Sequence, residues 1–347
     1  MKLKARLHPV KLQLKEPFTI SRGTYSQRFT LVVELRADGL SGFGEATQHD
    51  YYGITEQQLL AEGEKLQQLL PEIEFENPFD FWQALDPHFG HNRFFQSAVD
   101  VAAHDLYGKL LGKPVRECWP DDLRQWMKPP EEYAPSSYTL SIGSLEELEQ
   151  KIAARPDFQI YKIKADSDFD PAVLSALRQM TEARFCIDAN NAWDVEQALA
   201  LLPELQKAEL LFLEQPLPAG EREAMARLYE ASPLPLIADE TCRTPADVPA
   251  CAGRFHGINI KLMKCGGLTP ALDMVRLARK HGLQLMVGCM VETGIGISAA
   301  AQLLPFLDYA DLDGAILLAE NPWPGVELTK TGQIVLSDRP GIGLAAP

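Results

Sequence analysis

Short apolar segments in the second half of this sequence repeatedly end in a charged residue. The residues at these positions are Asp188, Glu214, Asp239 and Lys261, and the series begins with the pair Lys162 and Lys164. The segments before them, such as 185–187 and 258–260, have the length and composition of buried strands. A charged side chain is costly to bury without a partner, so charges at the ends of buried strands indicate a functional site.

The three acids suggest a metal site. Asp188, Glu214 and Asp239 end consecutive strands, so their carboxylates converge if those strands are parallel neighbours. A single acid at such a position is more often a capping or loop residue. Three acids at the ends of consecutive strands, close to lysines, favour a functional site instead. Carboxylates held together repel one another, and a hard divalent cation removes the repulsion. Three oxygen ligands with positions left for substrate and water suit Mg²⁺, and we expect one ion per subunit.

The lysines suggest proton transfer. Lys162 and Lys164 are two residues apart, so they point to the same side of their strand. Lys261 ends a later strand, which in a closed sheet lies across the mouth from Lys164. Two lysines on opposite sides of a bound substrate can remove a proton from one face and return it to the other. A solvated surface lysine is the alternative, but the apolar residues that precede these lysines argue against it.

The elements that would position these residues follow a regular alternation after Pro135. Eight strand candidates lie at 138–142, 161–164, 185–188, 211–214, 236–239, 257–261, 284–287 and 310–313. Amphipathic segments such as 145–154 and 195–202 separate them, which predicts a closed parallel (β/α)8-type barrel over residues 135–319. A doubly wound open sheet is the rival fold. It often begins with a glycine fingerprint, and no GxGxxG follows any strand candidate here.

Residues 1–120 predict an α+β capping domain. Segments 3–14 and 29–35 alternate apolar and polar residues, and turn residues at 39–44 precede a third short run, so we expect a three-stranded antiparallel meander. Between the first two strands, 19–25 is polar and is predicted to be a loop with Arg22 at its tip.

Two helices should follow in this domain. Thr55 and Gln58 form a candidate capping box before a leucine stripe that ends near residue 70. A second helix is expected over 92–111, where Gly112 and Pro114 end it. The proline-rich stretch 119–135 reads as a linker, and we expect segment 320–347 to join the capping domain.

Composition limits the classes of function. The chain has 347 residues, of which 46% are hydrophobic, and a net charge of -15, which argues against a broad nucleic-acid surface. The six cysteines are scattered without zinc-ligand spacing, as expected of reduced thiols in the cytoplasm. Segment 9–16 alternates and so offers no signal-peptide core. The apolar stretch 285–307 contains Glu292 and Pro305, which favours a strand and a helix over a membrane span.

Together these residues resemble the enolase superfamily in its muconate-lactonizing-enzyme subgroup, and the resemblance covers essentially the whole chain. It is carried by Arg22, the lysine pair, the three acids, and Ile260-Lys261-Leu262 with Gly266-Gly267 following. It implies a modified (β/α)7β barrel with an N-terminal capping domain. Within the subgroup the sequence is similar to bacterial L-Ala-D/L-Glu dipeptide epimerases, on segments 20–23, 286–290 and 310–314.

The narrower resemblance implies a Mg²⁺-dependent 1,1-proton transfer, through an enediolate, at the α-carbon of the C-terminal residue of a dipeptide such as L-Ala-L-Glu. Lys164 and Lys261 would be the catalytic pair. A lysine acts as a base only when neutral, and Lys162 and the metal are expected to favour that form of Lys164. The substrate-binding residues implied by the resemblance are Arg22, Thr139, Lys162, Cys289, Asp311 and Asp313. Asp311 and Asp313 would hold the α-ammonium, and Arg22 the side-chain carboxylate of a C-terminal glutamate.

Other activities stay open at this point. An o-succinylbenzoate synthase can share the two-lysine barrel, although it has no ammonium for Asp311 and Asp313 to bind, and an N-acyl amino acid racemase is a further alternative. A third alternative is a barrel that has lost catalysis and only binds its ligand. Ile54 stands where close relatives often have an acid, which leaves the role of its loop open. The family suggests recycling of murein peptides, and the residues do not decide whether the chain forms a homo-oligomer.

Overall fold

The eight strands predicted after Pro135 form one parallel sheet in the structure, a computed structural model that describes residues 1–345. They are β4 (Tyr138–Leu140), β5 (Ile160–Lys164), β6 (Arg184–Asp188), β7 (Leu213–Glu214), β8 (Leu236–Ala238), β9 (Gly257–Ile260), β10 (Gln284–Gly288) and β11 (Tyr309–Asp311). Each strand pairs with the next in chain order, and the backbone N–H of Ser137 donates to the carbonyl of Ala310 at 3.0 Å, which joins the first strand to the last. The predicted barrel is therefore confirmed.

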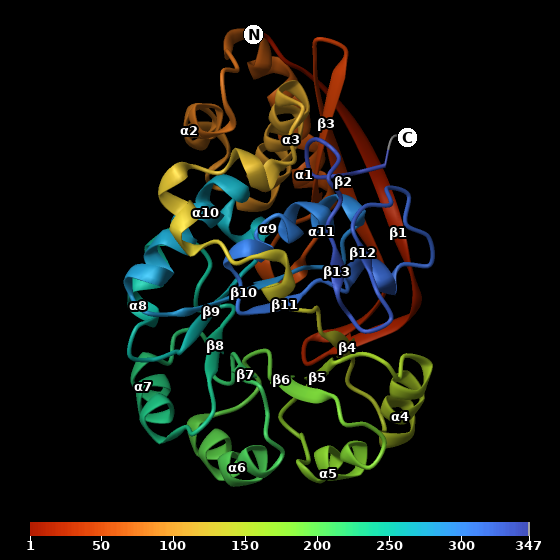
Figure 1. The fold of residues 1–347 in the computed structure, drawn as a ribbon, viewed down its shortest axis with the longest axis vertical. Coiled ribbons are helices and arrows are strands. Elements are labelled where there is room, and N and C mark those ends of the chain that lie inside the picture. Colours follow the sequence, from red (N-terminus) through yellow and green to blue (C-terminus); the bar gives the residue numbers. More distant parts are fainter. Residues whose placement is uncertain (346–347) are drawn as a thin grey trace.

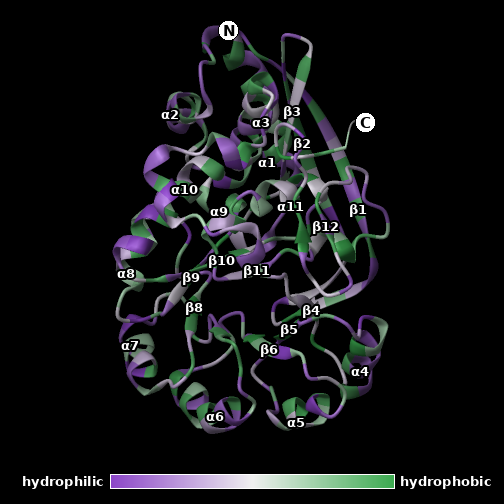
Figure 2. Cartoon of the chain, viewed as in Figure 1, coloured by the Kyte–Doolittle hydropathy of each residue, from purple (hydrophilic) through white to green (hydrophobic). Residues whose placement is uncertain are grey.

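Helices cover the barrel between its strands (Figure 1). They are α4 (Leu145–Ala154), α5 (Ala172–Arg178), α6 (Val195–Lys207), α7 (Arg222–Ala231), α8 (Val248–Cys251), α9 (Leu262–Cys265), α10 (Leu268–Lys280) and α11 (Gly294–Ala301). Their apolar faces pack inward, as on α6, where Ala198, Leu202 and Leu205 are buried. Figure 2 shows both hydrophilic and hydrophobic residues on these helices. The short turn η8 (Gly314–Leu317), rather than an α-helix, follows β11, which matches the implied (β/α)7β pattern.

The capping domain is an antiparallel meander with α1 and α3 packed on it and α2 packed on α3 (Figure 1). Its elements are β1 (Lys4–Ile20), β2 (Gly23–Ala37), β3 (Leu40–Thr47), α1 (Glu56–Leu69), α2 (Pro78–Phe89) and α3 (Arg93–Leu111). The Thr55–Gln58 capping box is present, and Gly112 ends α3 in the left-handed conformation at φ 66°. Gly44 of β3 has to be glycine, because a Cβ there would collide with the Ala98 carbonyl of α3. Helix α2 was not predicted from the sequence.

The expectation of a loop at 19–25 is wrong. The β1–β2 ladder continues to the pairs Thr19–Thr24 and Ile20–Gly23, so only Ser21 and Arg22 form the turn. The hydroxyls of Thr19 and Thr24 also lie 2.9 Å apart, which adds a cross-strand contact. This hairpin reaches the barrel, because the backbone N–H of Ile142 donates to the Thr19 carbonyl at 3.0 Å. Arg22 is thus held at the tip of an ordered hairpin.

Gly341 and Ile342 return the chain to the capping domain. The small hairpin of β12 (Glu327–Leu328) and β13 (Ile334–Val335) precedes them. The backbone N–H of Ile342 then donates to the Asp105 carboxylate of α3 at 2.8 Å, and Gly341 exchanges backbone hydrogen bonds with Lys113 and Val115. These contacts support our proposal that 320–347 belongs with residues 1–120, and the boundaries at 120, 135 and 319 stay a prediction.

No helix within residues 1–345 is long and apolar enough to cross a membrane. The apolar stretch 285–307 forms most of β10, then α11 and a short 3-10 turn, as predicted.

Candidate active site

The three acids meet at one end of the barrel. Asp188 and Glu214 are the last residues of β6 and β7 and are paired in the ladder, and Asp239 directly follows β8. One carboxylate oxygen of each lies within 4.8 Å of the other two, and all three residues are buried. The predicted convergence is confirmed as geometry. Such a set of oxygen donors can hold a hard divalent cation.

Lys162 lies beneath this cluster and is completely buried on β5. Its Nζ is 2.7 Å from Glu214 Oε2, 2.7 Å from Asp311 Oδ2 and 3.1 Å from Asp188 Oδ2. Burial alone would lower the pKa of Lys162, but the charges of Asp311, Glu214 and Asp188 outweigh it and raise that pKa well above its usual value. Lys162 is therefore a permanent positive charge that links the acid cluster to β11.

Lys164 and Lys261 face one shared space. Lys164 Nζ is 2.7 Å from Asp188 Oδ2, and Lys261 Nζ is 2.7 Å from Asp239 Oδ2. Both side chains line a cavity of about 90 Å³, which Lys164 enters from β5 and Lys261 from the position after β9. Three strands separate β5 from β9 in either direction around the barrel, so the two amines reach the cavity from opposite parts of the barrel wall. The sequence prediction of a lysine pair across the mouth agrees with this placement.

The electrostatics of the acid cluster are unbalanced. Burial, reinforced by the charge of Asp188, raises the pKa of Glu214 to about 7. The pKa values of Asp188 and Asp239 are lowered in spite of burial, because lysine ammonium groups contact their carboxylates. The cluster therefore holds two firmly ionised carboxylates beside one that resists ionisation. An added cation would remove this conflict.

A second acid pair lies at the end of β11. Asp311 accepts hydrogen bonds at Oδ1 from the Ser137 hydroxyl at 2.7 Å, and Asp313 accepts at Oδ2 from the backbone N–H of Thr139 at 2.6 Å. Burial and the neighbouring charge of Asp311 raise the pKa of Asp313 to about 7. Asp311, Asp313 and Thr139 line the same cavity as the two lysines, so the structure brings these predicted residues together.

Arg22 also lines this cavity, but it has a partner that the sequence analysis missed. Its Nη2 lies 2.5 Å from Oε1 of Glu240, and its guanidinium stacks over the Tyr51 ring at 4.1 Å. Within residues 1–345, its buried Nε and Nη1 have no hydrogen-bond partner. Arg22 thus keeps two donors for another group. Glu240 follows a metal-ligand candidate directly, and its sequence position gave no sign of a contact with a residue in the first hairpin.

The remaining predicted residue, Cys289, follows β10 and lines the cavity. His49 lies there too, and burial lowers its pKa to about 3, so it is neutral. Ile54 does not line the cavity. Its backbone pairs with that of His49 and its side chain packs on the core of the capping domain.

Lys264 is the principal residue that the sequence analysis missed. It lies three positions after Lys261, and its side chain is buried. Its ammonium donates to the Asp239 carboxylate at 2.5 Å, and to the carbonyls of Cys242 and Asn259 at 3.0 Å each. Its sequence neighbours, Met263 and Cys265, are apolar, and that is the one signal of burial.

Comparison with known proteins places this site in a family. Residues 2–118 match the model of the mandelate racemase / muconate lactonizing enzyme N-terminal domain, and residues 144–346 match the enolase C-terminal domain-like model. The chain belongs to the enolase superfamily. The structure has the architecture expected of this superfamily, which is a capping domain on a modified barrel.

Several proteins similar to this chain are epimerases. An L-Ala-D/L-amino acid epimerase of Maribacter sp. is 44% identical over 333 residues, which is 96% of each chain. An L-Ala-D/L-Glu epimerase of Bacteroides thetaiotaomicron is 36% identical and covers 99% of this chain and 88% of its own. The crystal structure of a dipeptide epimerase from Enterococcus faecalis, complexed with Mg and L-Leu-L-Tyr, superposes with a TM-score of 0.90 at 28% identity over the full length of both chains. This enolase-superfamily member is accordingly an isomerase of the racemase and epimerase type.

Proposed function

We propose that this enzyme is a Mg²⁺-dependent dipeptide epimerase that interconverts L-Ala-L-Glu and L-Ala-D-Glu. The observation that carries the proposal is the placement of Lys164 and Lys261 on one cavity with the acid pair Asp311 and Asp313. An epimerase needs two proton-transfer groups, and a dipeptide needs an anionic site for its α-ammonium. Neither an N-acyl amino acid nor the substrate of o-succinylbenzoate synthase offers an ammonium, so this pair argues against both alternative activities.

The acid cluster fits Mg²⁺. Its donors are all carboxylate oxygens, and burial together with the charge of Asp188 raises the pKa of Glu214, a cost that a divalent cation would relieve. We assign Asp188, Glu214 and Asp239 as its ligands, one ion per subunit. When bound, the ion would stabilise the negative charge that develops on the substrate carboxylate, an effect worth several kcal/mol as an order of magnitude.

The proton transfer itself belongs to the lysines. Lys164 removes the α-proton from one face of the C-terminal residue, and Lys261 delivers a proton to the opposite face; the reverse direction exchanges their roles. Each amine lies beside a carboxylate, Asp188 or Asp239, that orients it. Lys162 is buried behind the ligands, and its predicted contact with the substrate carboxylate stays a proposal.

The two ends of the dipeptide would be held by different parts of the chain. Asp311 and Asp313 bind the α-ammonium, and their mutual repulsion falls when it is present. Thr139 and the backbone around Cys289 line the dipeptide. The two partnerless donors of Arg22 are free to bind the side-chain carboxylate of a C-terminal glutamate.

The Glu240 contact supports a second, broader specificity. Since Glu240 already neutralises Arg22, the attraction for an acidic C-terminal residue is reduced, and uncharged residues would compete. This possibility is consistent with the Maribacter relative, which is an L-Ala-D/L-amino acid epimerase. A cytoplasmic location, a role in murein-peptide recycling and homo-oligomer formation are predictions from the sequence that we retain.

The test is α-deuterium exchange in heavy water. With Mg²⁺ present, L-Ala-L-Glu should gain one deuterium and convert to the D-isomer, and removal of the ion with EDTA should stop both processes. Exchange into N-succinyl amino acids but not dipeptides would contradict the proposal. A panel of L-Ala-X dipeptides decides between the narrow and the broad specificity.

A further inference from the structure

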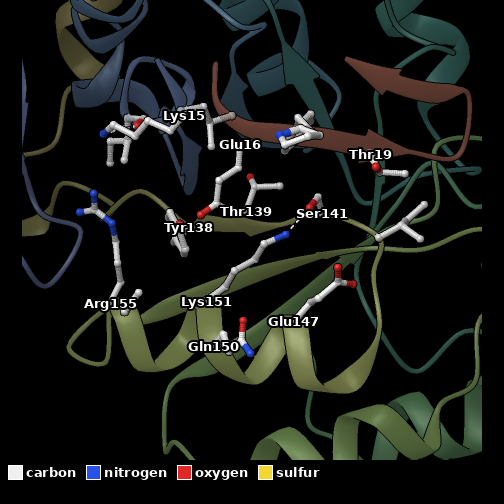
Figure 3. Close-up of a pocket in the computed structure, with 16 residues that line it drawn as sticks. Lys15, Glu16, Thr19, Tyr138, Thr139, Ser141, Glu147, Gln150, Lys151 and Arg155 are labelled. Carbon is white, nitrogen blue, oxygen red and sulfur yellow. Dashed lines mark hydrogen bonds between the residues drawn. The ribbon is translucent and has the colours of Figure 1, made fainter. Parts of the chain in front are cut away.

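A second, larger cavity lies next to the active site. It has a volume of about 500 Å³ and is enclosed by the β1 hairpin, β4, α4 and η8 (Figure 3). Phe18, Thr139 and Leu317 line both this cavity and the active-site cavity. The two spaces therefore meet at these three side chains, on the side of the active site where Thr139 contacts Asp313.

Three cations line the second cavity. They are Lys15 from β1, and Lys151 and Arg155 from α4 and its C-terminal end. Within the part of the chain that the structure describes, none of the three has a carboxylate oxygen within 4.0 Å. Lys15 donates to the Ile316 carbonyl at 2.9 Å, and Arg155 stacks over the Tyr138 ring at 5.5 Å.

Lys151 has the least satisfied environment of the three. Figure 3 shows its side chain rising from α4 into the cavity, where the ammonium bonds to the uncharged hydroxyl of Ser141. Half-burial lowers its pKa from the usual value, although the charges of Glu16 and Glu147 partly oppose this. Arg155 lies four residues further along the helix, and two like charges at that spacing destabilise a helix. A bound anion would relieve both costs.

The two acids at the cavity do not balance these charges. Glu147 is engaged in the capping box of α4, where its Oε2 accepts from the backbone N–H of Ser144 at 2.7 Å. Glu16 descends from β1 toward Tyr138, at a distance from the cations that makes no ion pair (Figure 3). Two carboxylates thus face three cations, so the cavity keeps an excess of positive charge.

We propose that this cavity is the binding site for an acidic side chain on the N-terminal residue of the peptide substrate. The inference rests on the proposed function, because it requires the α-ammonium to sit at Asp311 and Asp313. From that point the N-terminal side chain passes Thr139 and Leu317 and enters the second cavity. An aspartyl or glutamyl side chain would place its carboxylate near Lys151 and Arg155.

The first test compares two substrates of equal shape. The wild-type enzyme is given L-Glu-L-Glu and L-Gln-L-Glu, which differ in the charge of the N-terminal side chain alone. We expect kcat/KM to favour L-Glu-L-Glu by about tenfold at low salt, and the ratio to shrink as salt screens the contact. A ratio of one or less would overturn the proposal.

The second test asks which residues set this ratio. Lys151→Met and Arg155→Met should each reduce the preference for L-Glu-L-Glu over L-Gln-L-Glu several-fold. Lys151→Glu should make L-Lys-L-Glu a better substrate than L-Glu-L-Glu. Lys207→Met, a change on the exposed end of α6, is the matched control and should keep the wild-type ratio. Thermal unfolding of each variant verifies that it is folded. Ratios unchanged by all three cavity variants would refute the assignment.

The two proposals fail in different ways. If L-Ala-L-Glu exchanges its α-proton but the N-terminal charge has no effect, the assignment of the second cavity is wrong and the proposed epimerase function stands. If no dipeptide exchanges, the proposed function is wrong, and the cavity assignment falls with it.

Discussion

The ammonium of Lys264 is bonded to both the backbone carbonyl and the side-chain carboxylate of Asp239, at 2.6 and 2.5 Å. Lys261 contacts the other oxygen of the same carboxylate at 2.7 Å. Asp239 is therefore fixed from two sides, by one lysine that faces the active-site cavity and one that is buried behind it. Lys264 acts through Asp239 and is a positioning residue.

Lys264→Met should weaken both stability and metal binding. The variant keeps an unbranched side chain of similar length but leaves the Asp239 carboxylate and three carbonyls without their donor, so we expect a loss of about 3 kcal/mol in the free energy of unfolding. We also expect Mg²⁺ affinity to fall about 10- to 100-fold, as for other residues that orient a metal ligand. Urea denaturation and calorimetric titration with Mg²⁺ measure the two effects.

Lys207→Met serves as the control for this prediction, because Lys207 is exposed and should change stability by less than about 0.5 kcal/mol. A Lys264→Met enzyme that is destabilised but binds Mg²⁺ with wild-type affinity would show that Lys264 supports the fold and does not position Asp239.

Lys164→Ala and Lys261→Ala should separate the two halves of the reaction. Each variant should lose racemisation by about 10²- to 10⁴-fold, the usual contribution of a proton-transfer group. The remaining lysine can still exchange the α-proton on its own face. One variant should therefore exchange L-Ala-L-Glu in heavy water and the other L-Ala-D-Glu, as followed by proton NMR. Exchange of both isomers by either variant would mean that a different group serves the second face.

Asp313→Asn should weaken binding of the dipeptide's α-ammonium. Asp313 is the better residue of the pair to replace, because Asp311 also forms an ion pair with Lys162. A substitution of Asp311 would break that ion pair as well as the contact with the ammonium. A charge-assisted hydrogen bond contributes about 1.5–3 kcal/mol, so KM for L-Ala-L-Glu should rise by about ten- to a hundredfold with a smaller change in kcat. Steady-state kinetics provide the measurement, and an effect confined to kcat would place Asp313 in the proton-transfer step instead.

The sequence predicted the site well where a local pattern determines position. An acid that closes an apolar run must lie at a strand end, and parallel strand ends meet, so Asp188, Glu214 and Asp239 could be brought together without coordinates. The capping box of Thr55 and Gln58 is equally local, because both partners lie within one helical turn.

Prediction was poorer where contacts join distant segments. The Arg22–Glu240 ion pair spans 218 positions, and no periodicity reports it. The hairpin tip was taken for a loop because its residues are polar, although ladder hydrogen bonds do not require apolar side chains. Helix α2 was not predicted. It contains two prolines, of which Pro78 starts the helix, and α2 ends two residues after Pro87.

His256 should make stability depend on pH. Its Nδ1 accepts the backbone N–H of Leu236 at 3.0 Å, and burial lowers its pKa from the usual value near 6.5. As the pH falls, the unfolded chain therefore binds a proton on this imidazole at a higher pH than the folded chain does. The stability that the neutral ring contributes is fully present above pH 6.5 and is lost as the pH falls below it.

His256→Asn is the variant that tests this linkage, since the amide oxygen can replace the Nδ1 acceptor without titrating. We expect wild type and variant to have similar stability at pH 8, and the wild type to lose less than about 1 kcal/mol relative to the variant by pH 5, after allowance for solvent screening of this half-buried ring. Urea unfolding across this range gives the comparison, and parallel curves would assign the pH dependence to other groups.

Glu240→Gln should shift the choice of C-terminal residue. In the wild type, Glu240 supplies the negative charge that Arg22 would otherwise take from the substrate. The amide keeps a hydrogen-bond acceptor beside Nη2 but removes that charge, so the preference for L-Ala-L-Glu over L-Ala-L-Gln should increase by several-fold, up to about tenfold. Some stability should be lost, because Arg22 then lacks a carboxylate when no substrate is bound. Glu204→Gln, at an exposed ion pair on α6, is the control and should leave the preference unchanged. A preference that stays constant in Glu240→Gln would mean that the substrate side chain does not reach Arg22, and it would favour the broader L-Ala-X specificity.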